Sequence, residues 1–306
     1  MLLQSLLLVF SLALLYFGAE FALEASERIG RILKLSPLVI GVVLIGFGTS
    51  LPEFFVSQIS SFKGHPEMAI GNILGSNIAN IFLILGVSSL ITTLHLNKKA
   101  IQNQLVVHIF LSLTLGFIIY RQKIDYISML ILGIFFIFSL YKTFSDLKKH
   151  GEEIEEQENE SISIKNIGEL FIGFLLLYFG GDLLVSSGSK LAEGMGVSEY
   201  LISVIFVAFG TSFPELITAL VACKKKKDVD LITGNIIGSN IFNVAFVLGS
   251  LGVYNFPLKE KYILELSTLI IISLILFALS FWPKKLNRLI GTLFLGVYVS
   301  LIYYWF

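Results

Sequence analysis

The sequence predicts an all-α membrane protein with ten transmembrane helices arranged as two inverted five-helix repeats. Three observations lead to this prediction. Hydrophobic residues make up 55% of the 306-residue chain and charged residues only 14%, a composition that excludes a soluble domain of this length. Ten apolar stretches are each long enough to cross a hydrocarbon core of roughly 30 Å. Two motifs occur in the first half of the chain and again, in the same order, in the second half.

The ten apolar stretches form two sets of five. The first set lies at residues 2–27, 38–62, 67–91, 102–120 and 125–144. The second set lies at residues 166–190, 200–223, 229–253, 260–281 and 286–305. About 20 helical residues cross a membrane, so each stretch is predicted to form one helix. The first stretch has no basic region before it and no small-residue cleavage site, so we expect it to be a transmembrane helix and not a removable signal.

The positions of Lys and Arg predict the orientation. With the N-terminus outside, 16 of the 22 Lys and Arg residues fall in cytoplasmic loops. This excess is what the positive-inside rule describes, although the formal net charge of the chain is zero. We therefore expect a multi-pass cell-membrane protein with both termini outside. The glutamate-rich segment 145–165 is then a charged cytoplasmic linker between a first repeat, residues 1–144, and a second repeat, residues 166–306.

Two motifs relate the halves to each other. GTSLPE at 48–53 returns as GTSFPE at 210–215, an offset of 162 residues. GNILGSNIANIFLILG at 71–86 returns as GNIIGSNIFNVAFVLG at 234–249, with 10 of 16 positions identical and an offset of 163 residues. Each half has an odd number of predicted spans, so the second half must enter the membrane from the opposite side. Inverted repeats of this kind place binding sites near the middle of the bilayer, where the repeats meet.

The first motif predicts a break in the second and seventh helices. Pro52 has no N–H and leaves the carbonyl of Gly48 without its helical donor, and Pro214 has the same effect in the second half. Free carbonyls at membrane depth persist only where they face protein, water or an ion. A glutamate follows each proline, Glu53 or Glu215, although an acidic side chain at the bilayer centre costs roughly 2.5 to 3.5 kcal/mol. Together these groups predict an all-oxygen site for a hard cation such as Na⁺, Ca²⁺ or Mg²⁺.

The second motif predicts a polar stripe beside the carboxylates. The stripe consists of residues four positions apart, Asn72, Ser76 and Asn80 in the first half and Asn235, Ser239 and Asn243 in the second. Interhelical hydrogen bonding is the simpler interpretation for Asn72, Asn77, Asn235 and Asn240. The serines and the last asparagine of each stripe are favoured as part of the site because they lie near the carboxylates. His108, in the fourth stretch, has no repeat partner and is expected to form a local hydrogen bond.

With both motifs present twice, the chain resembles the sodium/calcium exchanger family of cation antiporters over nearly its whole length. In that family each of two repeats carries a G-T-S-x-P-E segment and a G-N-x-x-G-S-N segment. The resemblance implies that Glu53 and Glu215 are central ligands for Ca²⁺ or Na⁺ at the broken helices 2 and 7. It implies further oxygen atoms from the side chains of Thr49, Thr211, Ser76, Ser239, Asn80, Asn243, Ser50 and Ser212, and from the carbonyls of Gly46 and Ala208. Some potassium-dependent and archaeal members have Asp at the position of Asn243, so this asparagine argues against potassium cotransport.

The resemblance also implies a function, a sodium/calcium antiporter that works by alternating access. Ca²⁺ and Na⁺ are then substrates, no cofactor is expected, and membrane lipid is the expected partner, with neither nucleic acid nor an obligatory protein partner. A proton/calcium antiporter, or one for another divalent cation, is the nearest alternative, and a passive cation channel fits two inverted repeats less well. An enzyme is not expected, because neither motif contains a His, Lys or Asp that could activate a serine nucleophile.

Overall fold

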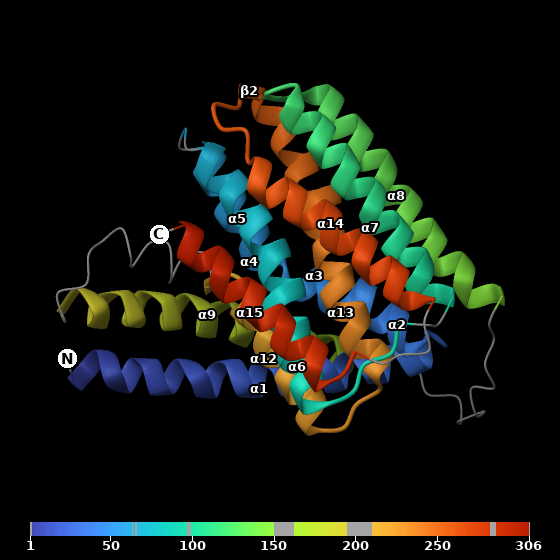
Figure 1. Ribbon diagram of the computed structural model, residues 1–306. Coiled ribbons are helices and arrows are strands. Elements are labelled where there is room, and N and C mark those ends of the chain that lie inside the picture. Colours follow the sequence, from blue (N-terminus) through green and yellow to red (C-terminus); the bar gives the residue numbers. More distant parts are fainter. Residues whose placement is uncertain are drawn as a thin grey trace.

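The computed structural model describes residues 2–62, 64, 66–96, 99–149, 162–194, 210–281 and 286–305. Figure 1 gives the labels of its elements. The first half contains helices α1 (Leu2–Ile32), α2 (Pro37–Val39), α3 (Gly46–Thr49), α4 (Leu51–Phe62), α5 (Pro66–Ala79), α6 (Gly86–Ile91), α7 (Lys99–Tyr120) and α8 (Tyr126–Lys149), strand β1 (Lys123–Ile124), and the π-helical turns η1 (Ile40–Ile45) and η2 (Asn80–Leu85). The second half contains helices α9 (Ile164–Gly194), α12 (Phe213–Lys224), α13 (Val229–Phe242), α14 (Ile263–Ser280) and α15 (Arg288–Trp305), strand β2 (Phe256–Pro257), the π-helical turn η4 (Asn243–Leu248) and the 3₁₀ turn η5 (Leu251–Tyr254).

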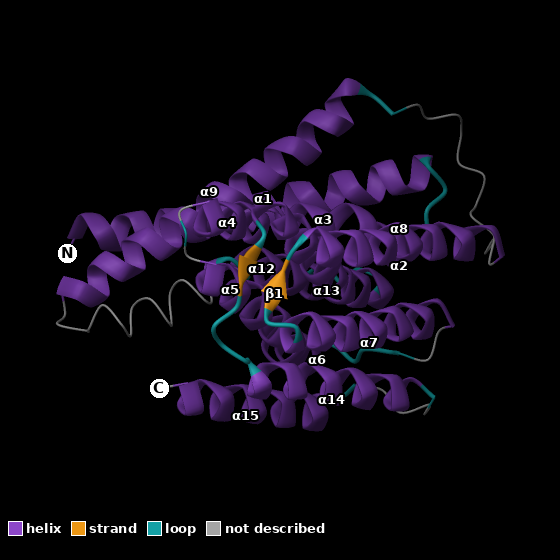
Figure 2. Ribbon diagram, turned by 90° about the horizontal axis from the view of Figure 1, so that it is seen from above, coloured by secondary structure: helices purple, strands orange, loops and turns teal. Residues whose placement is uncertain are grey.

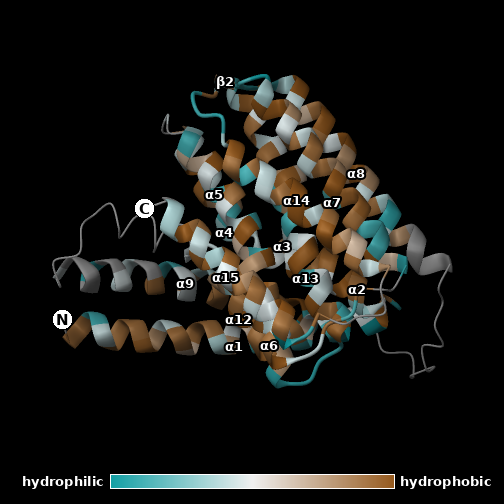
Figure 3. Ribbon diagram, in the orientation of Figure 1, coloured by the Kyte–Doolittle hydropathy of each residue, from teal (hydrophilic) through white to brown (hydrophobic). Residues whose placement is uncertain are grey.

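The outer surface of the helices is apolar. Figure 3 shows brown, hydrophobic residues along the outer helices, and large side chains such as Phe117 on α7 and Ile137 on α8 are exposed. Seven helices in the described part of the chain are long and apolar enough to cross a membrane. The pair Pro37–Thr49 and Leu51–Phe62, bent by 40°, adds an eighth if it is one span. Exposed apolar side chains on helices of this length suit lipid, so the chain is a multi-pass membrane protein.

The described spans differ from the ten predicted from hydropathy. The apolar part of α15, Arg288–Tyr304, is shorter than the seven long helices. Only the second part of the predicted span 200–223 is described, because Gly210 is the first described residue there and α12 begins at Phe213. Ala208 therefore lies outside the described residues. Helix α8 continues to Lys149 and α9 begins at Ile164, so both helices reach into the predicted linker, since charged residues beyond an apolar span can remain helical in water.

Helices α1 and α9 pack along each other and form a pair beside the remaining helices (Figure 1). A Cβ atom at Gly173 of α9 would lie 2.6 Å from the backbone nitrogen of Ala22 in α1, so only glycine permits this approach. Arg28, near the end of α1, donates to Glu169, near the start of α9, over 2.9 Å. The two helices therefore run antiparallel, and Figure 2 shows the same pair from above.

The interior of the protein is formed by the two segments that carry the second motif, α5–η2 and α13–η4. Each changes from an α-helix to a π-helical turn at an asparagine, Asn80 in the first half and Asn243 in the second. Helix α13 packs against η1 and α3. At Gly238 a Cβ atom would lie 2.6 Å from the Cα atom of Val42, so the two backbones are in contact. With the packing of α13 on α3, this contact places the second motif of the second half beside the start of the first motif of the first half.

Candidate ion-binding site

Two buried glutamates lie at the starts of helices. Glu53 is in the first turn of α4 and Glu215 is in the first turn of α12, and both residues are 0% exposed. The backbone leaves the α-helical conformation just before each of them, with φ −86° and ψ 8° at Ser50 and φ −88° and ψ 4° at Ser212. The two halves therefore present their carboxylates in the same way, each from a helix N-terminus, where negative charge is favoured.

Each carboxylate is held by a serine of the other half. Ser50 Oγ donates to Oε1 of Glu215 over 3.1 Å, and Ser212 Oγ donates to Oε1 of Glu53 over 3.3 Å. The second oxygen, Oε2, of each glutamate has no hydrogen-bond partner within the described residues. A buried carboxylate oxygen without a partner is unfavourable, so both Oε2 atoms mark places where a cation would be stabilised.

Thr211 joins the first motif of the second half to the polar stripe of the first half. Its Oγ1 donates to Oδ1 of Asn72 over 3.0 Å and lies 3.3 Å from Oγ of Ser76. Asn72 also donates to the backbone carbonyl of Glu53 over 3.3 Å and to Ser57 Oγ over 3.1 Å. Asn72 thus has hydrogen-bond partners on both sides, as the prediction of an interhelical role requires.

Thr49 joins the first motif of the first half to the polar stripe of the second half. Its Oγ1 lies 3.4 Å from Oδ1 of Asn235 and 3.4 Å from Oγ of Ser239. Ser239 Oγ in turn donates to the backbone carbonyl of Gly46 over 3.2 Å. Thr49, Ser239 and the Gly46 carbonyl therefore lie together. Asn235 also contacts Thr49 of the other half, but unlike the amide nitrogen of Asn72 its Nδ2 has no partner within the described residues.

Asn80 and Asn243 contribute two further buried side-chain oxygen atoms, and both residues are 0% exposed. Asn80 Nδ2 donates to Oδ1 of Asn240 over 2.9 Å, whereas Oδ1 of Asn80 has no partner among the described residues. Neither side-chain atom of Asn243 has a partner within the same residues. An amide oxygen left without a donor in a buried position is a suitable ligand for a hard cation.

The arrangement can bind a cation through oxygen atoms alone. Four buried side-chain oxygens without partners come from the two glutamates and these two asparagines. Hydroxyl groups of the motif serines and threonines surround the carboxylates, and they can orient either a lone pair or a proton toward the centre. Carboxylate, amide, hydroxyl and carbonyl oxygens are the ligands that Na⁺ and Ca²⁺ prefer, whereas softer metals favour nitrogen or sulfur.

Contacts between site residues join all of the predicted residues in the described part of the chain except Asn80 and Asn243. Eleven of the twelve sequence-predicted site residues are buried. These are Gly46, Thr49, Ser50, Glu53, Ser76, Asn80, Thr211, Ser212, Glu215, Ser239 and Asn243. The expectation of a local hydrogen bond for His108 is incomplete, because its ring contacts Ser273 and Asn240, which lie 165 and 132 residues away. The sequence signal for these contacts is a single histidine flanked by apolar residues in α7.

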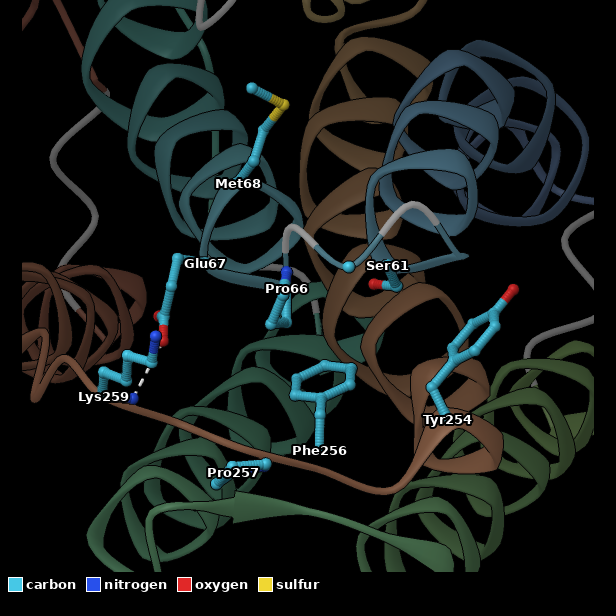
Figure 4. A pocket seen from close by; sticks show the side chains of 9 residues that line it. Ser61, Pro66, Glu67, Met68, Tyr254, Phe256, Pro257 and Lys259 are labelled. Atoms are coloured by element: carbon cyan, nitrogen blue, oxygen red, sulfur yellow. Dashed lines mark hydrogen bonds between the residues drawn. The ribbon is translucent and has the colours of Figure 1, made fainter.

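A larger cavity elsewhere does not have the properties of this site. It has a volume of about 610 Å³ and lies between the end of α4, the start of α5 and strand β2, as the close view in Figure 4 shows. Its carboxylate, Glu67, already accepts from the backbone nitrogen of Lys259 over 2.8 Å and from the hydroxyl of Tyr262. A smaller cavity of about 110 Å³, lined by Asp182 of α9 and by Thr211, reaches one of the predicted site residues, Thr211.

The fold and the apolar helices define a multi-pass membrane protein, and a cluster of oxygen atoms is buried in its interior. The family model described as "Sodium/calcium exchanger protein" matches residues 3–144 and 165–306. The chain therefore belongs to the sodium/calcium exchanger family.

Individual relatives cover almost the whole chain. A membrane protein of Methanocaldococcus jannaschii is 34% identical over 293 residues, 95% of this chain and 94% of that protein. The sodium/calcium exchanger MaX1 of Methanosarcina acetivorans is 24% identical and spans 97% of each chain. A solved structure of the sodium-calcium exchanger NCX_Mj, soaked with Na⁺ and Sr²⁺, superposes with a TM-score of 0.85 at 32% identity and covers 98% of both chains.

Proposed function

We propose that this chain is a sodium/calcium antiporter that exchanges Na⁺ for Ca²⁺ across a membrane by alternating access. The observation that carries the proposal is the crossed pair of hydrogen bonds, Ser50 to Glu215 and Ser212 to Glu53, which leaves one oxygen of each carboxylate buried and without a partner. Membership of the exchanger family supports a transporter in preference to an enzyme. It needs no cofactor beyond its transported ions.

The ligands are proposed to come from both halves. Glu53 and Glu215 bind Ca²⁺ between them, together with the amide oxygens of Asn80 and Asn243. The flanking sodium positions use the oxygens of Thr49, Thr211, Ser76 and Ser239 and the carbonyls of Gly46 and Ala208, and Ser50 and Ser212 support the carboxylates. The contact of Ser239 with the Gly46 carbonyl supports one such position. Because two carboxylates balance one Ca²⁺ or two Na⁺, the two ions compete for the same charge, as exchange requires.

The proposed architecture has ten transmembrane helices in two inverted repeats, residues 1–144 and 166–306, with helices 2 and 7 broken at the site. Both termini lie outside and the linker 145–165 is cytoplasmic. Contacts at one end of the bundle support this topology. Lys225, in the loop after α12, pairs with Glu24 of α1 over 2.7 Å, and Lys227 pairs with Glu27 over 2.5 Å. The end of α1 and the lysine loop therefore lie on the same face.

Calcium uptake into proteoliposomes tests the function. Vesicles loaded with Na⁺ should accumulate ⁴⁵Ca²⁺ against its gradient, vesicles loaded with choline should not, and a proton ionophore should leave the sodium-driven uptake in place. Uptake driven by a pH gradient without Na⁺ would identify a proton/calcium antiporter instead. Uptake without any opposing gradient would identify a channel.

Cysteine labelling tests the topology. In a background without Cys223, the lone cysteine of the chain, single cysteines in the 145–165 linker and beside the C-terminus should react with an impermeant reagent from opposite sides of the membrane. Labelling of the linker from outside in intact cells would reverse the assigned faces. The control is a cysteine at the lysine loop, which should behave like the linker.

A further inference from the structure

His108 lies in the interior of the protein with contacts to two helices of the other half. The residue is 3% exposed and belongs to α7, which packs against both α13 and α14. Its Nδ1 lies 2.8 Å from Oγ of Ser273 on α14, and its Nε2 lies 3.3 Å from Nδ2 of Asn240 on α13. Ser112, one turn further along α7, donates to the His108 carbonyl over 2.9 Å and fixes the local backbone.

The neighbouring groups determine which ring nitrogen carries the proton. Asn240 Nδ2 is a donor, so Nε2 of His108 must accept, and the proton is then on Nδ1. Nδ1 donates to Ser273 Oγ, and Ser273 donates its own proton to the backbone carbonyl of Leu269. Every donor in this series of hydrogen bonds, from Asn240 through His108 to Ser273, has an acceptor when the imidazole is neutral and protonated on Nδ1.

The same hydrogen bonds fix the amide of Asn240. Its two N–H groups point to the carbonyl of Asn77, over 3.2 Å, and to Nε2 of His108. Its Oδ1 must therefore point the other way, where it accepts from Nδ2 of Asn80 over 2.9 Å. The amide of Asn80 is oriented in turn, because its nitrogen faces Asn240 and its Oδ1 is the atom left without a partner.

We propose that His108 is a positioning residue that, through Asn240, turns the side-chain oxygen of Asn80 toward the transported cation. The inference rests on the proposed function, in which Asn80 is a ligand. His108 does not touch the ion. Its Nε2 accepts from Nδ2 of Asn240, which keeps Oδ1 of Asn240 facing Asn80. Because Asn80 Nδ2 donates to that oxygen, the Asn80 amide cannot rotate and present its nitrogen to a cation. Removal of a group that orients a metal ligand in this way commonly lowers the affinity for the metal 10- to 100-fold.

Two substitutions separate this role from simple packing. In His108→Asn the side-chain amide reaches the position of Nδ1 and can still bond to Ser273, but no acceptor remains at the position of Nε2. In His108→Gln the longer side chain brings an amide oxygen to the position of Nε2, where it can accept from Asn240, and the contact with Ser273 is lost. We expect the KM for Ca²⁺ in sodium-driven uptake to rise about tenfold in His108→Asn and less than threefold in His108→Gln, with a smaller change in the maximal rate of either variant.

A double-mutant cycle with Asn80→Ala decides whether the effect passes through Asn80. Calcium affinity is measured as KM and, independently, as the rise in melting temperature that Ca²⁺ produces in the purified full-length protein. His108→Asn should weaken Ca²⁺ binding in the parent and should add less than twofold when Asn80 is already Ala. The melting temperature without Ca²⁺ shows whether each variant is folded.

Each outcome of the cycle has a definite meaning. If Asn80→Ala binds Ca²⁺ like the parent, Asn80 is not a ligand, and both the ligand assignment and this inference are wrong. If Asn80→Ala weakens binding but His108→Asn does not, the assignment of Asn80 stands and His108 has no positioning role. Independent, multiplying losses in the double variant, or equal losses in His108→Asn and His108→Gln, would also overturn the inference.

Discussion

Asn80 and Asn243 occupy equivalent places in the two halves, yet the protein holds them differently. Both begin a π-helical turn and both are fully buried. Asn80 donates to Asn240, which is itself fixed by His108 and by the carbonyl of Asn77. The side chain of Asn243 makes no hydrogen bond within the described part of the chain. The repeat in sequence thus produces two equally buried asparagines, of which, within the described residues, only Asn80 is held by a hydrogen bond to a neighbouring side chain.

The cause of the difference lies outside the repeated motifs. Asn77 is the counterpart of Asn240, but its Oδ1 has no partner among the described residues and its Nδ2 reaches the carbonyl of Asn240 only over 3.5 Å. Helix α14 contains no histidine that could play the part of His108. One amide is therefore oriented before an ion arrives, whereas the other can orient itself around the ion.

The largest expected effect tests what the two halves share. Glu53→Gln and Glu215→Gln should each reduce sodium-driven Ca²⁺ uptake at least 100-fold, because the amide keeps one oxygen but no charge to balance the cation. Uptake into proteoliposomes measures the loss. Glu67→Gln is the matched control, since Glu67 lies at the surface cavity away from the site and should transport like the parent. Normal uptake by either Glu53→Gln or Glu215→Gln would remove the carboxylates from the site.

The second prediction compares the two asparagines directly. Asn80→Ala and Asn243→Ala should each raise the KM for Ca²⁺ about tenfold, because each removes one oxygen ligand. Only Asn80→Ala should also lower the stability of the ion-free protein, by roughly 1–3 kcal/mol, since it leaves Oδ1 of Asn240 buried without a donor. Thermal unfolding without Ca²⁺ distinguishes the two variants, and equal melting temperatures would mean that the halves are supported alike.

The third prediction compares Asn240 and Asn77, the repeat-equivalent asparagines next to the proposed ligands. Asn240→Ala should raise the KM for Ca²⁺ several-fold, because Asn80 loses the acceptor that orients it. Asn77→Ala should change KM by less than twofold, because the Asn77 side chain holds no ligand in place. Uptake at a series of Ca²⁺ concentrations measures both values. A larger effect of Asn77→Ala would reverse the asymmetry described above.

The smallest expected effect on transport is at Asp125, between the C-terminal end of α7 and the start of α8. Asp125 accepts from Arg121 over 2.7 Å and from the backbone nitrogen of Ser128 over 3.0 Å, and these bonds lower the pKa of Asp125 from 3.8 to about 2. A lowered pKa stabilises the folded protein above about pH 4, and this contribution is lost as the pH falls toward 2. Asp125→Ala should therefore reduce the free energy of unfolding by about 1 kcal/mol at pH 7 and progressively less below pH 4.

Thermal unfolding of the detergent-solubilised protein at several pH values checks this difference. The KM for Ca²⁺ should be unchanged in Asp125→Ala, because Asp125 does not touch the buried oxygen atoms. A changed KM would show that the C-terminal end of α7 influences His108, and the difference between Asn80 and Asn243 would then depend on more than the local hydrogen bonds.

The sequence was sufficient to predict the elements that depend on local patterns. Apolar stretches predict the long helices because lipid requires about 20 apolar residues, and the repeated motifs predict that Glu53 and Glu215 lie together. The contacts of Ser50 and Ser212 with the opposite glutamates agree with that prediction. Whether these groups bind the ions stays a prediction until transport is measured.

Other features could not be predicted because they depend on packing between distant segments. Asn80 and Asn243 have nearly the same sequence context, so any local argument assigns them the same environment. The difference arises from His108, whose contact with Asn240 joins residues 132 positions apart and has no periodic signal. The extension of α8 to Lys149 was also missed, because hydropathy marks where an apolar span ends and not where the helix ends.

The π-helical turns carry information about the origin of the chain. Asn80–Leu85 and Asn243–Leu248 are both six residues long and stand at the same offset of 163 residues that separates the second motifs. A π turn contains one residue more than an α-helical turn, so a single inserted residue is the smallest change that creates it. Since both halves carry the extra residue at the same place, the simplest history is one insertion in an ancestral half-length chain. If the two halves arose by gene duplication, the widened turn is then older than that duplication.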